Sequence, residues 1–181
     1  DSHWYPQFAL SQDDDELVEF ELTAGAPDGW HLVSQGNGTS RDDQGVAHWS
    51  SGGPLDEIYL VGGPLVRYRR VLPISAGSPT APTSVRSLAS PTPPTPDTVE
   101  ALVYLRQEDA ALAERYLSAT AQYIEMYAQL IGPYPYGKFA LVENFWETGF
   151  GMASFTLLGP QAIRMPLILA SSYPHEILHN R

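Results

Sequence analysis

The chain of 181 residues is long enough for one domain or two small ones, and its hydrophobic fraction of 43% and aromatic fraction of 11% are typical of a folded protein rather than a disordered one. Its formal net charge of −11 argues against nucleic acid and anionic membranes as partners. The absence of cysteine excludes disulfide bonds and thiolate metal sites.

The sequence shows neither a membrane span nor a signal peptide. No stretch approaches the roughly 20 apolar residues that a spanning helix needs. The chain begins at Asp1 without a methionine, so we expect that an upstream segment has been removed or was never included. The expected location is periplasmic or extracellular.

The N-terminal part predicts short strands separated by turns. Apolar residues alternate with acidic ones over residues 18–22, as in a half-exposed strand. Further strands are predicted at residues 30–33, 46–49, 58–61 and 65–71, with Gly- and Pro-containing turns between them. We expect an antiparallel sandwich or sheet over roughly residues 15–72, within a partial N-terminal β domain at residues 1–72.

A segment rich in Pro, Ser, Thr and Ala follows at residues 73–97. This composition predicts a linker or exposed loop that is partly polyproline II, and it marks the boundary between two domains. A role as a peptide ligand in signalling is the alternative to a spacer.

The second unit, residues 98–181, combines strands and helices. A strand is predicted at residues 99–106, and a helix at residues 108–131 that Gly132 and Pro133 end. The helix carries one apolar stripe, which is expected to be core: Leu112, Tyr116, Ala119, Tyr123, Met126 and Leu130. Strands are predicted at residues 137–142 and 150–158, and a third element at 163–169. The fold class is therefore α+β.

The last residues contain an H-E-x-x-H pattern formed by His175, Glu176 and His179. Residues four apart lie on the same face of a helix, so both imidazoles can reach one metal ion, and zinc suits them. Glu176 is placed to hold a water on that metal and to take its proton. The alternative is an ordinary amphipathic helix with two surface histidines. The helix is predicted to start at residues 171–174, with a Ser or Tyr cap and Pro174 in the first turn.

A catalytic zinc ion normally has three protein ligands, and only two are evident here. The other histidines, His3, His31 and His48, lie far upstream and are expected to be surface or strand residues. We therefore interpret the chain as a piece of a longer protein, with the third ligand beyond Arg181.

Several segments together resemble the gluzincin zinc aminopeptidases, the family of membrane alanyl aminopeptidase. They are Gly-Pro-Tyr-Pro-Tyr-Gly-Lys-Phe at residues 132–139, Phe-Gly-Met at 150–152 and His-Glu-x-x-His-Asn at 175–180. Residues 56–64 also resemble the end of the family's N-terminal β domain. The order and spacing agree with the family, in which a substrate loop G-x-M-E-N precedes the zinc helix.

The resemblance implies the first part of a thermolysin-like catalytic domain behind a β-sandwich-like piece. It implies a Zn²⁺ cofactor held by His175 and His179, with Glu176 as the general base, and a peptide substrate hydrolysed by the zinc-bound water. The family's third ligand, a Glu, and its oxyanion-stabilising Tyr would both lie beyond Arg181. The full-length protein is then expected to be an aminopeptidase, while this piece is expected to be inactive alone.

The sequence departs from the family pattern in the substrate loop, which corresponds to Gly151, Met152, Ala153 and Ser154. Ala153 stands where the family has the Glu that pairs with the substrate's α-amine, and alanine cannot bind an ammonium group. Glu147 is a nearby carboxylate that could replace it. A non-catalytic member of the same fold, which binds peptides or partners, is the alternative reading.

Overall fold

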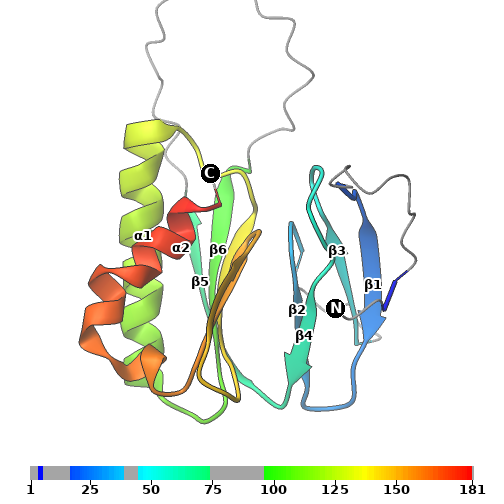
Figure 1. The fold of residues 1–181 in the computed structure, drawn as a ribbon, viewed down its shortest axis with the longest axis horizontal. Coiled ribbons are helices and arrows are strands. Elements are labelled where there is room, and N and C mark those ends of the chain that lie inside the picture. The colour runs from blue at the N-terminus through cyan, green and yellow to red at the C-terminus, as the bar shows by residue number, and fades with distance from the viewer. Residues whose placement is uncertain (1–3, 6–16, 39–44, 74–95, 181) are drawn as a thin grey trace, which may run out of the picture.

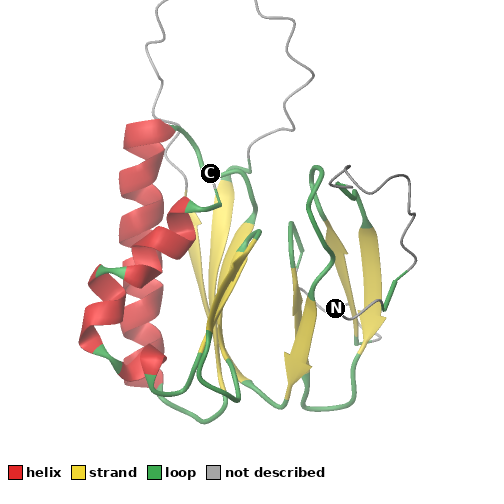
Figure 2. Ribbon diagram, in the orientation of Figure 1, coloured by secondary structure: helices red, strands yellow, loops and turns green. Residues whose placement is uncertain are grey.

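The computed structural model describes residues 4–5, 17–38, 45–73 and 96–180, and it has the α+β composition that the sequence predicts (Figure 1). A five-stranded sheet forms the middle layer. Helices cover one of its faces, and two smaller sheets lie on the other side. The layers are coloured by secondary structure in Figure 2.

The central sheet has the strand order β5-β6-β7-β9-β8. Its strands are β5 (Val66–Pro73), β6 (Thr98–Leu105), β7 (Lys138–Glu143), β8 (Gly149–Met152) and β9 (Phe155–Leu158). The three inner strands are parallel, and the two edge strands β5 and β8 run antiparallel to their neighbours. The inner strands β6 and β7 are buried almost throughout, as expected for parallel strands that are covered on both faces.

The N-terminal sheets each contain two antiparallel strands. They pair β1 (Glu21–Gly25) with β3 (Val46–Ser50) and β2 (His31–Ser34) with β4 (Leu60–Gly63). The strand predicted at residues 18–22 begins later, at Glu21, because Val18 forms only an isolated bridge to Leu55. Val33 of β2 packs in a buried cluster with residues of the central sheet, including Leu102, Tyr104, Ala140, Val142 and Phe155. This cluster joins the N-terminal part to the sheet.

The helical layer consists of α1 (Ala110–Ile131), the short 3-10 helices η1 (Ala162–Arg164) and η2 (Pro166–Ala170), and α2 (Ser172–Leu178). Asp109 caps α1 by accepting a hydrogen bond from the Leu112 N–H at 2.9 Å. The predicted apolar stripe of α1 is buried at Leu112 and Tyr116, but Leu130 is 70% exposed. The stripe is therefore core only over the first part of the helix.

Strand β5 differs from the prediction, which placed it in the N-terminal sheet. It pairs with β6 along its whole length, from Val66↔Leu105 to Pro73↔Thr98. That placement was wrong because the strands on either side of the Pro-rich segment meet as a hairpin, which local patterning does not reveal. Residues 74–95 lie outside the described residues, so the linker and the domain boundary stay predictions.

Two further segments differ in detail. The segment predicted as one strand at residues 150–158 forms two antiparallel strands, β8 and β9, joined by a turn at Ala153 and Ser154. The element predicted at residues 163–169 is the pair of 3-10 helices. The turn matters for function because it carries the predicted substrate loop.

Candidate metal centre

Helix α2 brings the two histidines of the H-E-x-x-H pattern together. The Nε2 atoms of His175 and His179 are 2.8 Å apart, and both side chains are exposed. The ring centroids are 4.3 Å apart. On the opposite face of the helix, Tyr173 and Ile177 are fully buried. The amphipathic arrangement therefore directs both imidazoles outward on one face.

Tyrosine side chains hold α2 and the segment before it on α1. Because the Thr120 hydroxyl donates to the Tyr116 carbonyl, the hydroxyl of Tyr173 is the donor in its 2.6 Å hydrogen bond to Thr120. Tyr127 donates to the Pro174 carbonyl at 3.1 Å. Burial raises the pKa of the Tyr173 hydroxyl, so it remains a neutral donor. The motif thus lies on a helix that the buried core holds in place.

The start of α2 differs in part from the prediction. Pro174 does lie in the first turn. The N-cap residue Ser171 makes no side-chain capping bond, and its hydroxyl instead donates to the Leu167 carbonyl at 2.8 Å. The tyrosine contacts with α1, rather than a cap, therefore hold this end of the helix.

The geometry of the two imidazoles fits a shared metal ion. Two nitrogens bound tetrahedrally to zinc at about 2.0–2.1 Å are about 3.3 Å apart, so a small rotation of either ring suffices. Within the described ranges, no group of three or more His, Asp or Glu side chains could hold a metal. His31 and His48 lie on β2 and β3, which belong to the two N-terminal sheets and are far from α2 in the sequence. The described residues therefore offer two ligands.

Glu176 approaches the edge strand β8. The position where a Cβ would stand at Gly151 overlaps Oε2 of Glu176 and lies 3.4 Å from its carboxyl carbon. The half-buried carboxylate thus occupies the space beside the strand that any side chain at Gly151 would fill. The structure places the predicted general base directly against the predicted substrate loop.

The other three residues of the predicted substrate loop are less exposed than Gly151. Met152 is half-buried and packs against the cluster formed with Val33. Ala153 is half-buried in the turn, and Ser154 is fully buried with φ 68°. Of the four predicted substrate-binding residues, only Gly151 is exposed. A substrate-binding role for all four stays a prediction.

Glu147 has its own partners. Its carboxylate accepts hydrogen bonds from the backbone N–H of Gln161 at 2.9 Å and of Ala162 at 3.4 Å, at the start of η1. It is therefore oriented toward that helix start, and it does not replace the missing carboxylate at Ala153 in this conformation.

Sequence reasoning assigned no role to two polar residues beside the site, Lys138 and Asn180, although both lie in the segments that carry the family resemblance. Lys138 is the only lysine in the sequence and is 1% exposed, and burial lowers its pKa to about 7. Asn180, 6% exposed, follows the second histidine and binds the β8–β9 turn. A lysine at the start of a strongly apolar strand was the signal that could have drawn attention to β7.

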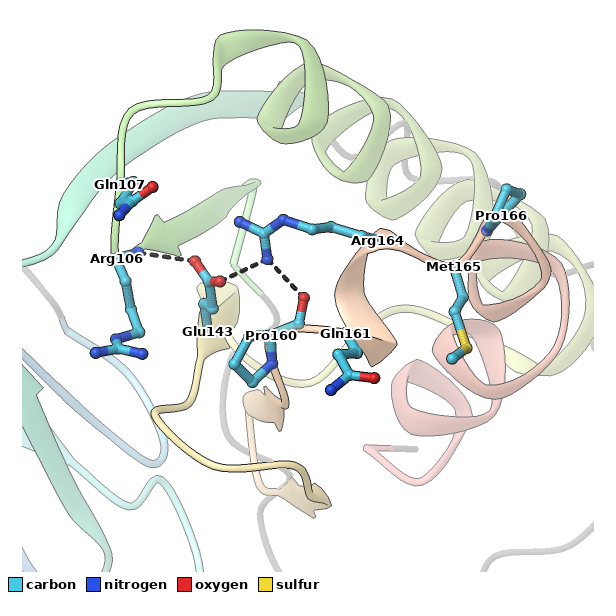
Figure 3. Close-up of a pocket in the computed structure, with 8 residues that line it drawn as sticks. All are labelled: Arg106, Gln107, Glu143, Pro160, Gln161, Arg164, Met165 and Pro166. Carbon is cyan, nitrogen blue, oxygen red and sulfur yellow. Dashed lines mark hydrogen bonds and ion pairs between the residues drawn. The ribbon is translucent and has the colours of Figure 1, made fainter.

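A separate hollow of about 720 Å³ lies at the carboxyl ends of the parallel strands (Figure 3). On its wall, the buried carboxylate of Glu143 accepts hydrogen bonds from the Arg106 N–H at 2.8 Å and from Arg164 at 2.6 Å. None of the predicted site residues lines it. The hollow and the histidine pair are therefore distinct features.

Among the helices that the structure describes, none is long and apolar enough to cross a bilayer.

The comparisons with known proteins give structural likeness only. No protein-family model matches the sequence, and no curated protein matches it significantly. Leukotriene A4 hydrolase from Saccharomyces cerevisiae has a similar structure, with a TM-score of 0.61 at 15% identity over 92% of this chain and 22% of the other. An M1 zinc metallopeptidase from Deinococcus radiodurans gives a TM-score of 0.58 at 15% identity, over 92% of this chain and 34% of that one.

A mutant of the Deinococcus protein bound to a Tyr-Ser-Ala substrate gives a TM-score of 0.58 at 16% identity, over the same shares of the two chains. The chain thus spans between about a fifth and a third of the length of these proteins. At these identities the likeness establishes the fold alone. The described residues have the fold of the corresponding part of M1 zinc metallopeptidases and leukotriene A4 hydrolase.

Proposed function

We propose that this chain belongs to an M1-type zinc metallopeptidase that hydrolyses peptide bonds. One observation carries the proposal: the Nε2 atoms of His175 and His179 converge on one face of α2 while Glu176 lies against Gly151 of an exposed edge strand. The likeness to M1 zinc metallopeptidases supports it, because the same fold there belongs to metal-dependent peptidases.

His175 and His179 would hold the zinc ion, and a third ligand would come from residues beyond Arg181. When bound, zinc polarises a carbonyl oxygen and lowers the pKa of a coordinated water. Glu176 would hold that water by a hydrogen bond and take its proton, which is the task of a general base. The half-buried carboxylate of Glu176, which directly follows His175, lies beside β8, and this position supports the proposed role as general base.

Strand β8 would bind the substrate backbone. It is the edge of the central sheet, and Gly149, Phe150 and Gly151 are exposed along it. An extended peptide can add to such an edge through main-chain hydrogen bonds. The Tyr-Ser-Ala complex of the Deinococcus protein supports a peptide as the class of substrate.

The full-length protein is proposed to act as an aminopeptidase. Ala153 supplies no carboxylate, and Glu147 is engaged at η1. This same observation favours the second candidate, a non-catalytic protein that uses the fold to bind peptides or partners. Retention of both histidines and of Glu176 favours the enzyme.

The experiment compares zinc content and peptidase activity of the full-length protein with those of its Glu176→Gln variant. Peptides with free and with acetylated N-termini serve as substrates. We expect one zinc per protein in both forms and a loss of kcat of roughly 10²–10⁴-fold in the variant, the typical contribution of a general base. Glu114→Gln, an exposed position on α1, is the matched control and should keep full activity.

The outcomes distinguish an aminopeptidase from a peptidase of broader specificity and from a non-catalytic binding protein. Cleavage of free N-termini alone supports an aminopeptidase, and cleavage of acetylated peptides as well indicates that Ala153 has broadened the specificity. Zinc binding without cleavage favours the binding protein. A full-length protein that binds no zinc would refute the proposal.

A further inference from the structure

A continuous series of hydrogen bonds connects the N-terminal sheet to the motif helix. It begins at Lys138, whose Nζ donates to the Ser34 carbonyl at 2.7 Å and to the hydroxyl of Ser154. The backbone N–H of Ser154 donates to Oδ1 of Asn180. The amide Nδ2 of Asn180 then donates to the carbonyl of Glu176 at 2.8 Å. The series therefore runs from β2 through β7 and the β8–β9 turn to α2.

The lysine at the start of the series has no role in balancing charge. It is 1% exposed, and in the part of the chain that the structure describes no carboxylate pairs with it. Its hydrogen-bond acceptors are a carbonyl and a hydroxyl, and the ring of Phe155 lies 5.9 Å from Nζ. Burying a lysine in this way is costly and is offset only by hydrogen bonds. What Lys138 contributes is thus the connection between its two partners.

Ser154, the middle of the series, has an unusual backbone. It is the one residue other than glycine with positive φ among the described residues. Such a conformation is strained for serine and persists when its surroundings hold it. Here the hydroxyl is held by Lys138 and the N–H by Asn180. The shape of the β8–β9 turn therefore depends on both partners.

The far end of the series determines where the motif lies. Asn180 joins the Ser154 turn to the carbonyl of Glu176, so it fixes the last turn of α2 relative to the β hairpin. That hairpin contains Gly151, against which the Glu176 carboxylate rests. A shift of either partner would move the carboxylate relative to the edge strand. Catalytic groups lose much of their effect when misplaced by as little as about 1 Å.

We propose that Lys138 and Asn180 are positioning residues that act through Ser154 to hold the β8–β9 hairpin in register with the last turn of α2. This inference rests on the proposed peptidase function, because Glu176 is the group being positioned. Neither residue touches the reacting atoms. The series also makes the geometry of the site depend on the N-terminal sheet, through the Ser34 carbonyl.

The first test measures kcat and KM of the full-length protein and of its Lys138→Met and Asn180→Leu variants, well below their melting temperatures. Loss of an outer partner of a catalytic group typically costs about 10- to 100-fold in activity. We expect that loss in kcat for each variant, with KM changed by less than about twofold. Leu72→Ala is the control: it removes core packing on β5, at the opposite edge of the sheet, and should lower the melting temperature without lowering kcat.

The double variant tests whether the two residues act in one series. We expect Lys138→Met with Asn180→Leu to lose little more activity than the worse single variant, because either change already breaks the connection. If the logarithms of the two losses add, the residues act independently and the proposal is overturned. It is also overturned if both single variants keep the kcat of the parent, since the residues would then serve stability alone.

The second test does not depend on catalysis. Hydrogen exchange of the metal-free full-length protein reports the amide of Ser154, and loss of its acceptor in Asn180→Leu should speed exchange about tenfold. In Leu72→Ala, the Ser154 amide should lose no more protection than the fall in global stability accounts for. If the Ser154 amide is unaffected in Asn180→Leu, the proposal fails. If instead the parent cuts no peptide, the proposed function fails and the exchange result still decides the positioning role.

Discussion

Burial of Lys138 predicts that the stability of the chain rises between about pH 7.5 and about pH 9, and replacing Lys138 by methionine is expected to remove that rise. The lysine is buried, and burial lowers its pKa from 10.5 to about 7. Between these two values the unfolded chain carries a proton on the lysine that the native chain has lost. Stability therefore rises with pH, because raising the pH favours the state with fewer bound protons.

The magnitude follows from linkage. The slope approaches about 1.4 kcal/mol per pH unit where the native lysine is neutral and the unfolded lysine is charged. Integrated from about pH 7.5 to about pH 9, the gain is roughly 2 kcal/mol. Methionine has no proton to lose, so its curve should lack this gain. Three tyrosines with pKa raised to about 12, Tyr59, Tyr104 and Tyr116, stay neutral over this range in both proteins.

The assay is urea unfolding of the 181-residue chain and its Lys138→Met variant at several pH values across this interval. The difference between the two free energies of unfolding isolates the lysine, since every other group is shared. Because Lys138 is the only lysine, isotope labelling of lysine gives one side-chain signal whose titration reports the native pKa directly. Parallel stability curves, or a lysine signal that titrates near its ordinary value, would refute the reasoning.

Two further changes test the site and its support. Gly151→Ala places a methyl group where the Glu176 carboxylate lies, so we expect kcat of the full-length protein to fall at least about tenfold with zinc content unchanged. Gly25→Ala is the control, because it lies on β1 outside the proposed site and its Cβ would meet nothing within 4 Å; equal activity of the two variants would contradict the geometry. Tyr173→Phe removes the hydrogen bond to Thr120 and should cost about 1 kcal/mol, or about 2–4 °C in Tm by calorimetry; an unchanged Tm would show that this bond does not hold α2.

Local sequence patterns were enough to predict the main elements of the second unit. The helical period at α1, the apolar strands β6 and β7 and the four-residue spacing of His175 and His179 were all predicted, because each depends on neighbours a few residues away. The same periodicity explains why both imidazoles project from one face of α2.

Contacts between distant segments became visible only in the folded chain. Strand β5 joins β6 rather than the N-terminal sheet, Glu176 rests against Gly151, and Lys138 connects Ser34 to Ser154. Pairing between strands and contacts between buried polar groups depend on how whole faces pack, and no local pattern encodes them. The chemistry of the motif could therefore be read from the residues of one helix, whereas its position beside the edge strand required the folded chain.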